Sequence, residues 1–224
     1  MKQDLAVLLA ALLILAGGCS RPAAEPESRP RPAPVSAAAT AAAPGGGAVK
    51  VTDAADKVLF RMELDEAGRQ NIYEAGAQVV ARLSLQSDRL RLSDANGKLL
   101  LEIQRSGNKG KAFDASGAEL FSIKPHSSKA GDFKLEGPGG ALLYRLKKES
   151  YGYKVTDAQD QTLFKMKSDA SGGRVVADGD DGAKKMTIKG SADALAACAA
   201  VLESLEPARR AALYAYLARL EGGK

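Results

Sequence analysis

Apolar and polar positions alternate along residues 49–189 in a pattern that recurs about every twenty residues. The clearest two copies are KVTDAADKVLFRM at residues 50–62 and KVTDAQDQTLFKM at residues 154–166. Each copy contains a turn residue, which we use as its anchor. The seven anchors, spaced 20 to 23 residues apart, are Asp53, Glu74, Asp94, Asp114, Gly137, Asp157 and Asp178. This spacing predicts seven copies of one structural unit.

Each anchor has apolar or small residues at fixed distances from it. For Asp53 these are Val51 two positions before, Leu59 six positions after and Met62 nine positions after. The residues next to the anchor are Asp, Asn, Gly and small residues, which favour a tight turn between alternating strands. Each copy is therefore expected to form a β-hairpin. The seventh copy departs from the pattern, with Lys184 and Thr187 at the two later positions.

Seven hairpins in series predict a mainly β fold over residues 48–190, a meander of about 12–14 strands. A sheet of that size curls or closes, because exposed strand edges promote aggregation. We therefore expect a closed barrel.

The last part of the chain, residues 191–224, predicts helices. Residues 192–202, ADALAACAAVL, are apolar except for Asp193. A helix that is apolar on all sides is buried or lies in a membrane, and eleven residues are too few to cross a bilayer. This helix is therefore expected to fill the barrel, with Ser191 as its N-cap and Cys198 as a buried apolar residue.

A second helix is expected from Pro207 to about Glu221, because proline suits the first turn of a helix. Leu213, Tyr214 and Leu217 face one way in it, together with Leu220, while its arginines are offset. The spacing predicts one buried face on this helix.

A long meander followed by an apolar C-terminal helix resembles the tubby-like fold. That superfamily includes tubby C-terminal domains, plant LURP-one-related proteins and phospholipid scramblases. The cadence in RLSDANGKLLLEI and KAFDASGAELFSI is similar to theirs. The resemblance covers residues 48 to about 205 and implies a twelve-stranded barrel around the helix. The alternative is a spiral of hairpins like YD-repeat proteins, although the Tyr-Asp pair itself is missing.

The N-terminus predicts export. Residues 5–16, LAVLLAALLILA, form an apolar run that would reach roughly 18 Å as a helix, too short for a bilayer core of about 30 Å. The run is followed by Gly17, Gly18 and Cys19, which resembles the bacterial lipobox, with Ala16 in the usual Leu place. We expect a signal peptide over residues 1–18, cleavage between Gly18 and Cys19, and lipid on Cys19.

Residues 19–47 are expected to be the lipidated cysteine and a tether. They are rich in Pro and Ala and have almost no large apolar side chains, so they cannot bury enough surface to fold. Ser20 follows the cysteine, and resemblance to enterobacterial sorting then implies the periplasmic face of the outer membrane. The expected partner of the anchor is the membrane.

The net charge of +5 weakly favours anionic partners. If buried positions align across each turn, basic residues become outward-facing neighbours in three pairs: Lys50 with Arg61, Lys134 with Arg145, and Lys154 with Lys165. These six residues are the candidate anion- or lipid-binding residues, and some tubby-like domains bind phosphoinositides through basic surfaces. The alternative is a solvated face whose bases meet acids such as Glu63 or Glu102.

The sequence contains no recognisable catalytic set. His126 is the single histidine and the two cysteines are Cys19 and Cys198, which leaves no usual zinc site. The acidic run DGDDG at residues 178–182 falls where other copies have turns. We expect no cofactor, no metal, no nucleic-acid partner and no enzymatic activity. The expected function is a lipid-anchored envelope protein that binds or scaffolds, with an assembly factor that binds another protein as the alternative.

Overall fold

The computed structural model describes residues 48–64, 69–74, 76–126, 129–169, 171–190 and 193–221. The expected signal peptide, cleavage site, Cys19 and tether lie outside the described residues. Among those residues, no helix is both long and apolar enough to cross a bilayer.

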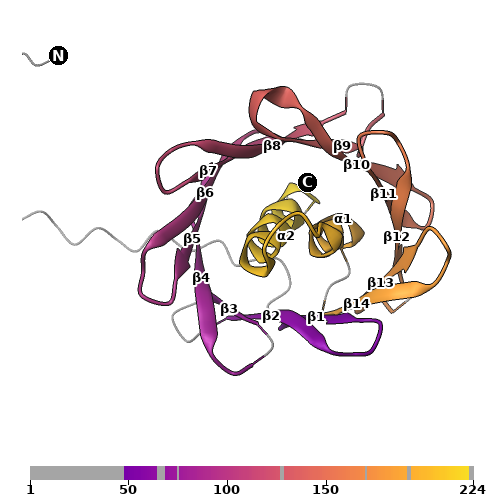
Figure 1. The fold of residues 1–224 in the computed structure, drawn as a ribbon, viewed down its shortest axis with the longest axis horizontal. Coiled ribbons are helices and arrows are strands. Elements are labelled where there is room, and N and C mark those ends of the chain that lie inside the picture. The colour runs from indigo at the N-terminus through magenta and orange to yellow at the C-terminus, as the bar shows by residue number, and fades with distance from the viewer. Residues whose placement is uncertain are drawn as a thin grey trace, which may run out of the picture. The chain divides into compact units, whose positions relative to one another are not determined.

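The described residues form fourteen antiparallel strands in one closed barrel, in which each strand pairs with its neighbours in sequence and β1 pairs with β14 (Figure 1). The strands are β1 (Val49–Asp53), β2 (Val58–Leu64), β3 (Gln70–Tyr73), β4 (Val79–Leu85), β5 (Arg89–Asp94), β6 (Leu99–Ser106), β7 (Lys109–Asp114), β8 (Glu119–Pro125), β9 (Phe133–Glu136), β10 (Leu142–Glu149), β11 (Gly152–Thr156), β12 (Thr162–Ser168), β13 (Arg174–Gly179) and β14 (Lys184–Lys189). The predicted barrel is confirmed, and a spiral of hairpins is not what these residues form.

The seven repeat copies are the seven hairpins that begin with the odd-numbered strands, from β1–β2 to β13–β14. Their turns all lie at one end of the barrel, which we call the turn end. The connections between hairpins lie at the other end, the link end. The turn of β9–β10 includes a short 3-10 segment, η1 (Pro138–Gly140).

Every hairpin carries a β-bulge at the same place, on its second strand just after the turn. In β1–β2, Val51 is opposite Phe60 and Thr52 is opposite Val58, which leaves Leu59 without an opposite residue. The seven bulge residues are Leu59, Val80, Leu100, Leu120, Leu143, Leu163 and Lys185. A bulge bends a strand and increases its twist, so seven equivalent bulges favour closure of the sheet into a barrel.

The apparent break in the seventh copy is an error in our choice of anchor. Gly179 N–H donates to Ala183 O at 2.9 Å, as Asp53 N–H donates to Lys57 O at 3.0 Å in the first copy. The true anchor is therefore Gly179 and not Asp178. Counted from Gly179, the later apolar position is Ile188, which is fully buried. Only the bulge position, Lys185, differs in kind from the other six copies.

The anchor aspartates explain why these turns form. The Asp53 carboxylate accepts hydrogen bonds from Ala55 N–H and Lys57 N–H, both at 2.9 Å. Asp94, Asp114 and Asp157 make the same pair of bonds in their own turns. The third residue after the anchor has a positive φ in six copies, namely Asp56, Gly97, Gly117, Gly140, Asp160 and Gly182. Glycine adopts this conformation without strain, which accounts for its recurrence there.

The barrel interior is filled by three C-terminal segments: α1 (Ala194–Ala197), η2 (Cys198–Val201) and α2 (Pro207–Glu221). The single helix expected over residues 192–202 is thus a short α-helical turn that continues as 3-10 helix. Its N-cap is Asp193, whose carboxylate accepts from Ala196 N–H at 3.0 Å, and not Ser191. All residues from Ala194 to Leu202 are buried, as the sequence predicts.

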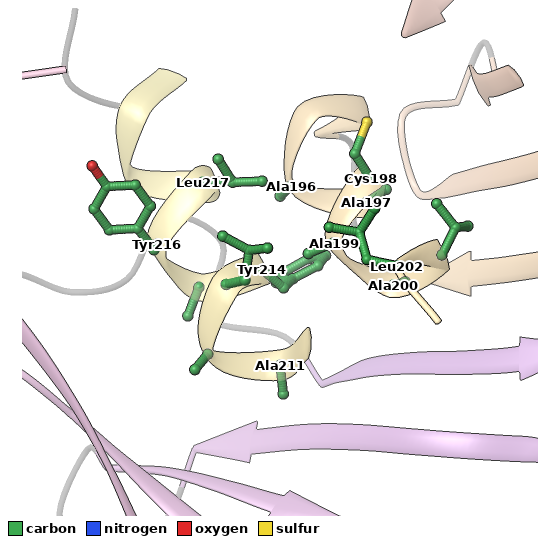
Figure 2. Close-up of a cluster of buried hydrophobic side chains, with 14 of the residues drawn as sticks. Ala196, Ala197, Cys198, Ala199, Ala200, Leu202, Ala211, Tyr214, Tyr216 and Leu217 are labelled. Atoms are coloured by element: carbon green, nitrogen blue, oxygen red, sulfur yellow. The ribbon is translucent and has the colours of Figure 1, made fainter. Parts of the chain in front are cut away.

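The second helix also lies inside the barrel, which the sequence did not predict. Residues 211–217 of α2 are all buried, where one buried face was expected. Figure 1 shows α1 and α2 within the ring of strands, with α1 against β11 and β12 and α2 against β2, β4 and β5. A barrel this wide needs more than one short helix to fill it. Figure 2 shows how the alanines of α1, η2 and α2 let these segments pack closely.

Candidate functional site

The six predicted basic residues form the three cross-strand pairs that the repeat suggested. Lys50 is opposite Arg61, Lys134 is opposite Arg145, and Lys154 is opposite Lys165. They alternate with buried neighbours such as Val51, Leu135 and Val155, so their side chains point outward.

Two of these pairs belong to one continuous surface. Arg145 and Lys147 are two residues apart on β10, and Lys147 is opposite Lys154. Lys134 is also opposite Lys124 on β8. We call this surface over β8 to β12 the basic wall, and its residues are Lys124, Lys134, Arg145, Lys147, Lys154 and Lys165. The pair Lys50–Arg61 lies apart from it on β1 and β2.

Three acids compensate part of the basic wall. Asp160 accepts from Arg145 Nη1 at 3.1 Å and also from Lys147, whose hydrogen bond lowers the pKa of Asp160 to about 2. Glu136 lies 2.6 Å from Lys124 Nζ. Glu149 lies 3.8 Å from Lys154 Nζ. Six bases against three acids leave a local excess of three positive charges.

Lys134 and Lys165 carry that excess most clearly. Neither side chain makes a hydrogen bond or an ion pair with any residue in the described part of the chain. Lys134 lies between Lys124 and Arg145 on the neighbouring strands. Lys165 lies between Lys154 and Asp178, but Asp178 is already paired with Lys167 at 2.7 Å. Both lysines are therefore available to an external anion.

Some basic residues elsewhere on the barrel are paired with acids, as the alternative predicted. Arg61 pairs with Glu63 at 3.3 Å and lies over the Tyr73 ring, 4.4 Å from its centroid. On β5 and β6, Glu102 accepts from Arg91 at 2.7 Å and from Arg89 at 3.3 Å. The hydrogen bond from Arg91 lowers the pKa of Glu102. Among the described residues, the unpaired lysines of the basic wall are thus Lys134 on β9 and Lys165 on β12, and a second unpaired pair, Lys50 opposite Lys189, lies on β1 and β14.

A second candidate site is a pocket of about 970 Å³ at the turn end of the barrel. The turns of β1–β2 and β13–β14, the start of β12, and the connection from η2 to α2 surround it. We call it the mouth pocket. Its apolar side chains are Ala54, Ala55, Leu59, Leu163, Phe164 and Met186, and its charged side chains are Asp53, Asp180, Asp181, Lys185, Glu203 and Arg210. A concave, partly apolar site at the mouth of a barrel is a usual place for a small ligand.

The two basic residues of the mouth pocket are held by the protein itself. Lys185 pairs with Asp181 at 2.9 Å. Arg210 donates to three backbone carbonyls, those of Leu205, Ala200 and Glu203, at 2.7, 3.3 and 3.3 Å. Burial lowers the pKa of the Arg210 guanidinium.

Two acids of the mouth pocket make no hydrogen bond or salt bridge with a described residue through their carboxylates, although the charge of Glu203 acts on Arg210. These acids are Asp180 and Glu203, and both are exposed. Sequence analysis missed this pocket, although one signal was present: Lys185 occupies a bulge position that is Leu or Val in every other copy.

The described residues contain no group of three His, Cys, Asp or Glu side chains that could hold a metal ion. His126 follows β8 in the connection to β9, and Ser127 and Ser128 lie outside the described residues. Cys198 is buried in η2, with its thiol 3.2 Å from Ala194 O.

No family model matches the sequence, and no curated protein matches it either. An Arabidopsis thaliana protein solved by X-ray crystallography is similar to it in structure, with 16% identity and a TM-score of 0.36. The match covers 58% of this chain and 90% of the Arabidopsis protein. We take no functional argument from this likeness. The closed barrel around C-terminal helices is nonetheless the arrangement that the tubby-like resemblance implies, with fourteen strands in place of twelve.

Proposed function

We propose that this chain is a lipid-anchored protein of the bacterial cell envelope whose barrel is a non-catalytic binding domain. In this proposal the barrel contacts anionic lipid headgroups through the basic wall. The observation that carries it is the excess of three positive charges over β8 to β12, with Lys134 and Lys165 lacking any described acidic partner.

The basic wall destabilises the sheet, and this supports a function for it. Like charges placed opposite each other on neighbouring strands destabilise a sheet by a few tenths of a kcal/mol or more per pair. An anionic surface reverses that cost, because each basic residue near it contributes about 1 kcal/mol. Three uncompensated charges would then contribute about 3 kcal/mol, or roughly a hundredfold in membrane partitioning.

The anchor and the wall would act together. Lipid on Cys19 would supply the main attachment, and Ser20 favours the outer membrane by its resemblance to sorting signals. The tether of 28 residues would reach roughly 30 Å as a coil and up to about 90 Å when extended. It would therefore allow the barrel to turn its basic wall towards the membrane.

Vesicle sedimentation tests the wall separately from the anchor. The chain from Ser20 onward, which keeps every described residue, is mixed with vesicles of phosphatidylglycerol in phosphatidylcholine at low and physiological salt. We expect binding that rises with the anionic fraction and falls with salt. The double variant K134Q/K165Q should lose most of it.

The matched control is K98Q/K109Q, which removes the same charge from exposed lysines on the side of the barrel carrying β5 to β7. It should bind nearly as the parent does. If the two double variants bind equally well, the wall is not the contact, and the excess charge is only a solvated face.

The alternative function is an envelope assembly factor that binds another protein. The mouth pocket favours it, because an apolar floor at the open end of a barrel suits an inserted side chain. Crosslinking in intact cells followed by affinity purification separates the two. A single envelope protein captured by the parent and by K134Q/K165Q alike would favour the assembly factor.

A further inference from the structure

The mouth pocket lies at the hairpin β13–β14, the one copy of the repeat whose bulge residue is a lysine and not an apolar residue. Leu163 and Leu59 are the bulge residues of the hairpins on either side, and both line the pocket. Between them, the bulge residue of β13–β14 is Lys185. Its side chain runs back over its own turn, along Gly179 and onto Asp181. The apolar cover that a leucine would supply at this position is therefore missing.

The helices leave this side of the mouth open as well. α2 packs towards β2, β4 and β5, and α1 packs towards β11 and β12. The connection between η2 and α2 crosses the turn end and contributes Glu203 to the pocket, and the first turn of α2 contributes Arg210. The space above Met186 and Phe164 is thus bounded by strands on one side and by this connection on the other.

The charges around this apolar floor favour a cation. Four acids face two bases, and both bases are already bound to protein oxygens, Lys185 to a carboxylate and Arg210 to three carbonyls. Asp180 and Glu203 make no ion pair or hydrogen bond through their carboxylates with a described residue, although the charge of Glu203 acts on Arg210 and partly offsets the lowering of its pKa by burial. An anionic ligand would meet these two carboxylates, whereas an ammonium group would neutralise them.

We propose that the mouth pocket binds an organic ligand with an apolar body and a cationic amine. The apolar body lies on Leu59, Leu163 and Phe164, and the amine lies at the rim near Asp180 and Glu203. The pocket volume of about 970 Å³ is at the upper end of the range for small-molecule sites. This site is separate from the basic wall, so its test does not depend on whether the basic wall binds lipid.

Three probes with the same ten-carbon chain test the charge preference: decylammonium, decanol and decanoate. Each is titrated into the chain from Ser20 onward, below its micelle concentration, and binding is followed by calorimetry. We expect decylammonium to bind at least tenfold more tightly than decanoate, with decanol between them. Equal affinity for all three, or tighter binding of decanoate, would overturn the proposal.

Variants then locate the site. K185L restores the apolar bulge residue of the other six copies, and it should close the pocket and weaken decylammonium at least tenfold. The matched control L143K places a lysine at the bulge of β9–β10, away from the pocket, and should bind as the parent does. D180N/E203Q should reduce decylammonium to the affinity of decanol. Unchanged binding by K185L, with a thermal transition showing that it is folded, would also overturn the proposal.

Discussion

Gly110 at the start of β7 lies directly against the ring of Tyr216 on α2. A Cβ at position 110 would come within 2.6 Å of both the ring Cζ and the hydroxyl oxygen. Glycine is therefore required here by the close approach of the inner helix to the barrel wall. The contact fixes the end of α2 at the link end, where Arg219 also donates to Gln86 O at 3.1 Å.

The first prediction concerns this contact. G110A should destabilise the protein by about 1–3 kcal/mol, because the added methyl group forces the ring or the strand to move. Y216L in the same chain should recover part of that loss by removing the ring. Urea unfolding of both single variants and the double variant gives the coupling between the positions. Additive effects of the two substitutions would show that they do not touch in solution.

Tyr216 also predicts a dependence on alkaline pH. Its hydroxyl is buried without a hydrogen-bond partner among the described residues, and burial raises its pKa to about 12. The unfolded chain loses this proton near pH 10, before the folded chain does. Stability from this group is thus complete below pH 10 and is lost as the pH rises towards 12. Y216F should unfold at a urea midpoint that falls less between pH 9 and 11 than that of the parent, and an identical fall would refute this.

The two aspartates with positive φ predict different effects of the same substitution. Asp56 and Asp160 occupy equivalent turn positions, with φ of 60° and 66°. D56G should relieve backbone strain and stabilise the protein by about 0.5 kcal/mol. D160G relieves the same strain but removes the carboxylate that holds Arg145 and Lys147, so it should gain less or lose stability. Thermal unfolding at pH 7 and pH 2 checks this, because the difference between the variants should begin to shrink as the pH approaches the Asp160 pKa of about 2, where this carboxyl is half protonated.

Local sequence chemistry determined most of the barrel. The anchor aspartates and the glycines three residues later are typical of tight turns, so the hairpins and their number could be predicted. The bulges could not, because Leu59 and its equivalents look like ordinary inward-facing residues. Placing Asp178 as an anchor was wrong because its neighbour Gly179 makes the turn hydrogen bond through its backbone, which no side chain reveals.

The number of helices inside the barrel depends on the width of the closed sheet, which cannot be read from the sequence. That width follows from the register of all fourteen strands. Because the arginines are offset from the face of Leu213, Leu217 and Leu220, the sequence suggested a helix with only one buried face for α2. The basic wall was predictable because cross-strand register follows from the turns, whereas the mouth pocket depends on where the helices leave space.

The export signal predicts the behaviour of one substitution in cells. C19S should leave the protein unprocessed, or release it from membranes, because the acylated thiol is lost. Mobility on gels and membrane fractionation measure both effects. S20D is an informative companion, since resemblance to enterobacterial sorting implies that it moves the protein to the inner membrane. Normal processing and membrane association of C19S would refute lipidation at Cys19.

The inner helices predict a severe effect from a single charge. Ala197 lies at the end of α1 and has no exposed surface, and Figure 2 shows it beside Cys198 among the packed helical segments. A197D would place an unpaired carboxylate there, which costs several kcal/mol and is a large part of the stability of a domain. The exposed A54D, on the turn of β1–β2, is the control and should fold normally.

The same reasoning predicts that a chain ending at Gly190 will not fold, because the strands would enclose an empty apolar interior. Circular dichroism and amide NMR spectra measure this, and a sharp thermal transition of the shortened chain would show that the barrel closes without its helices.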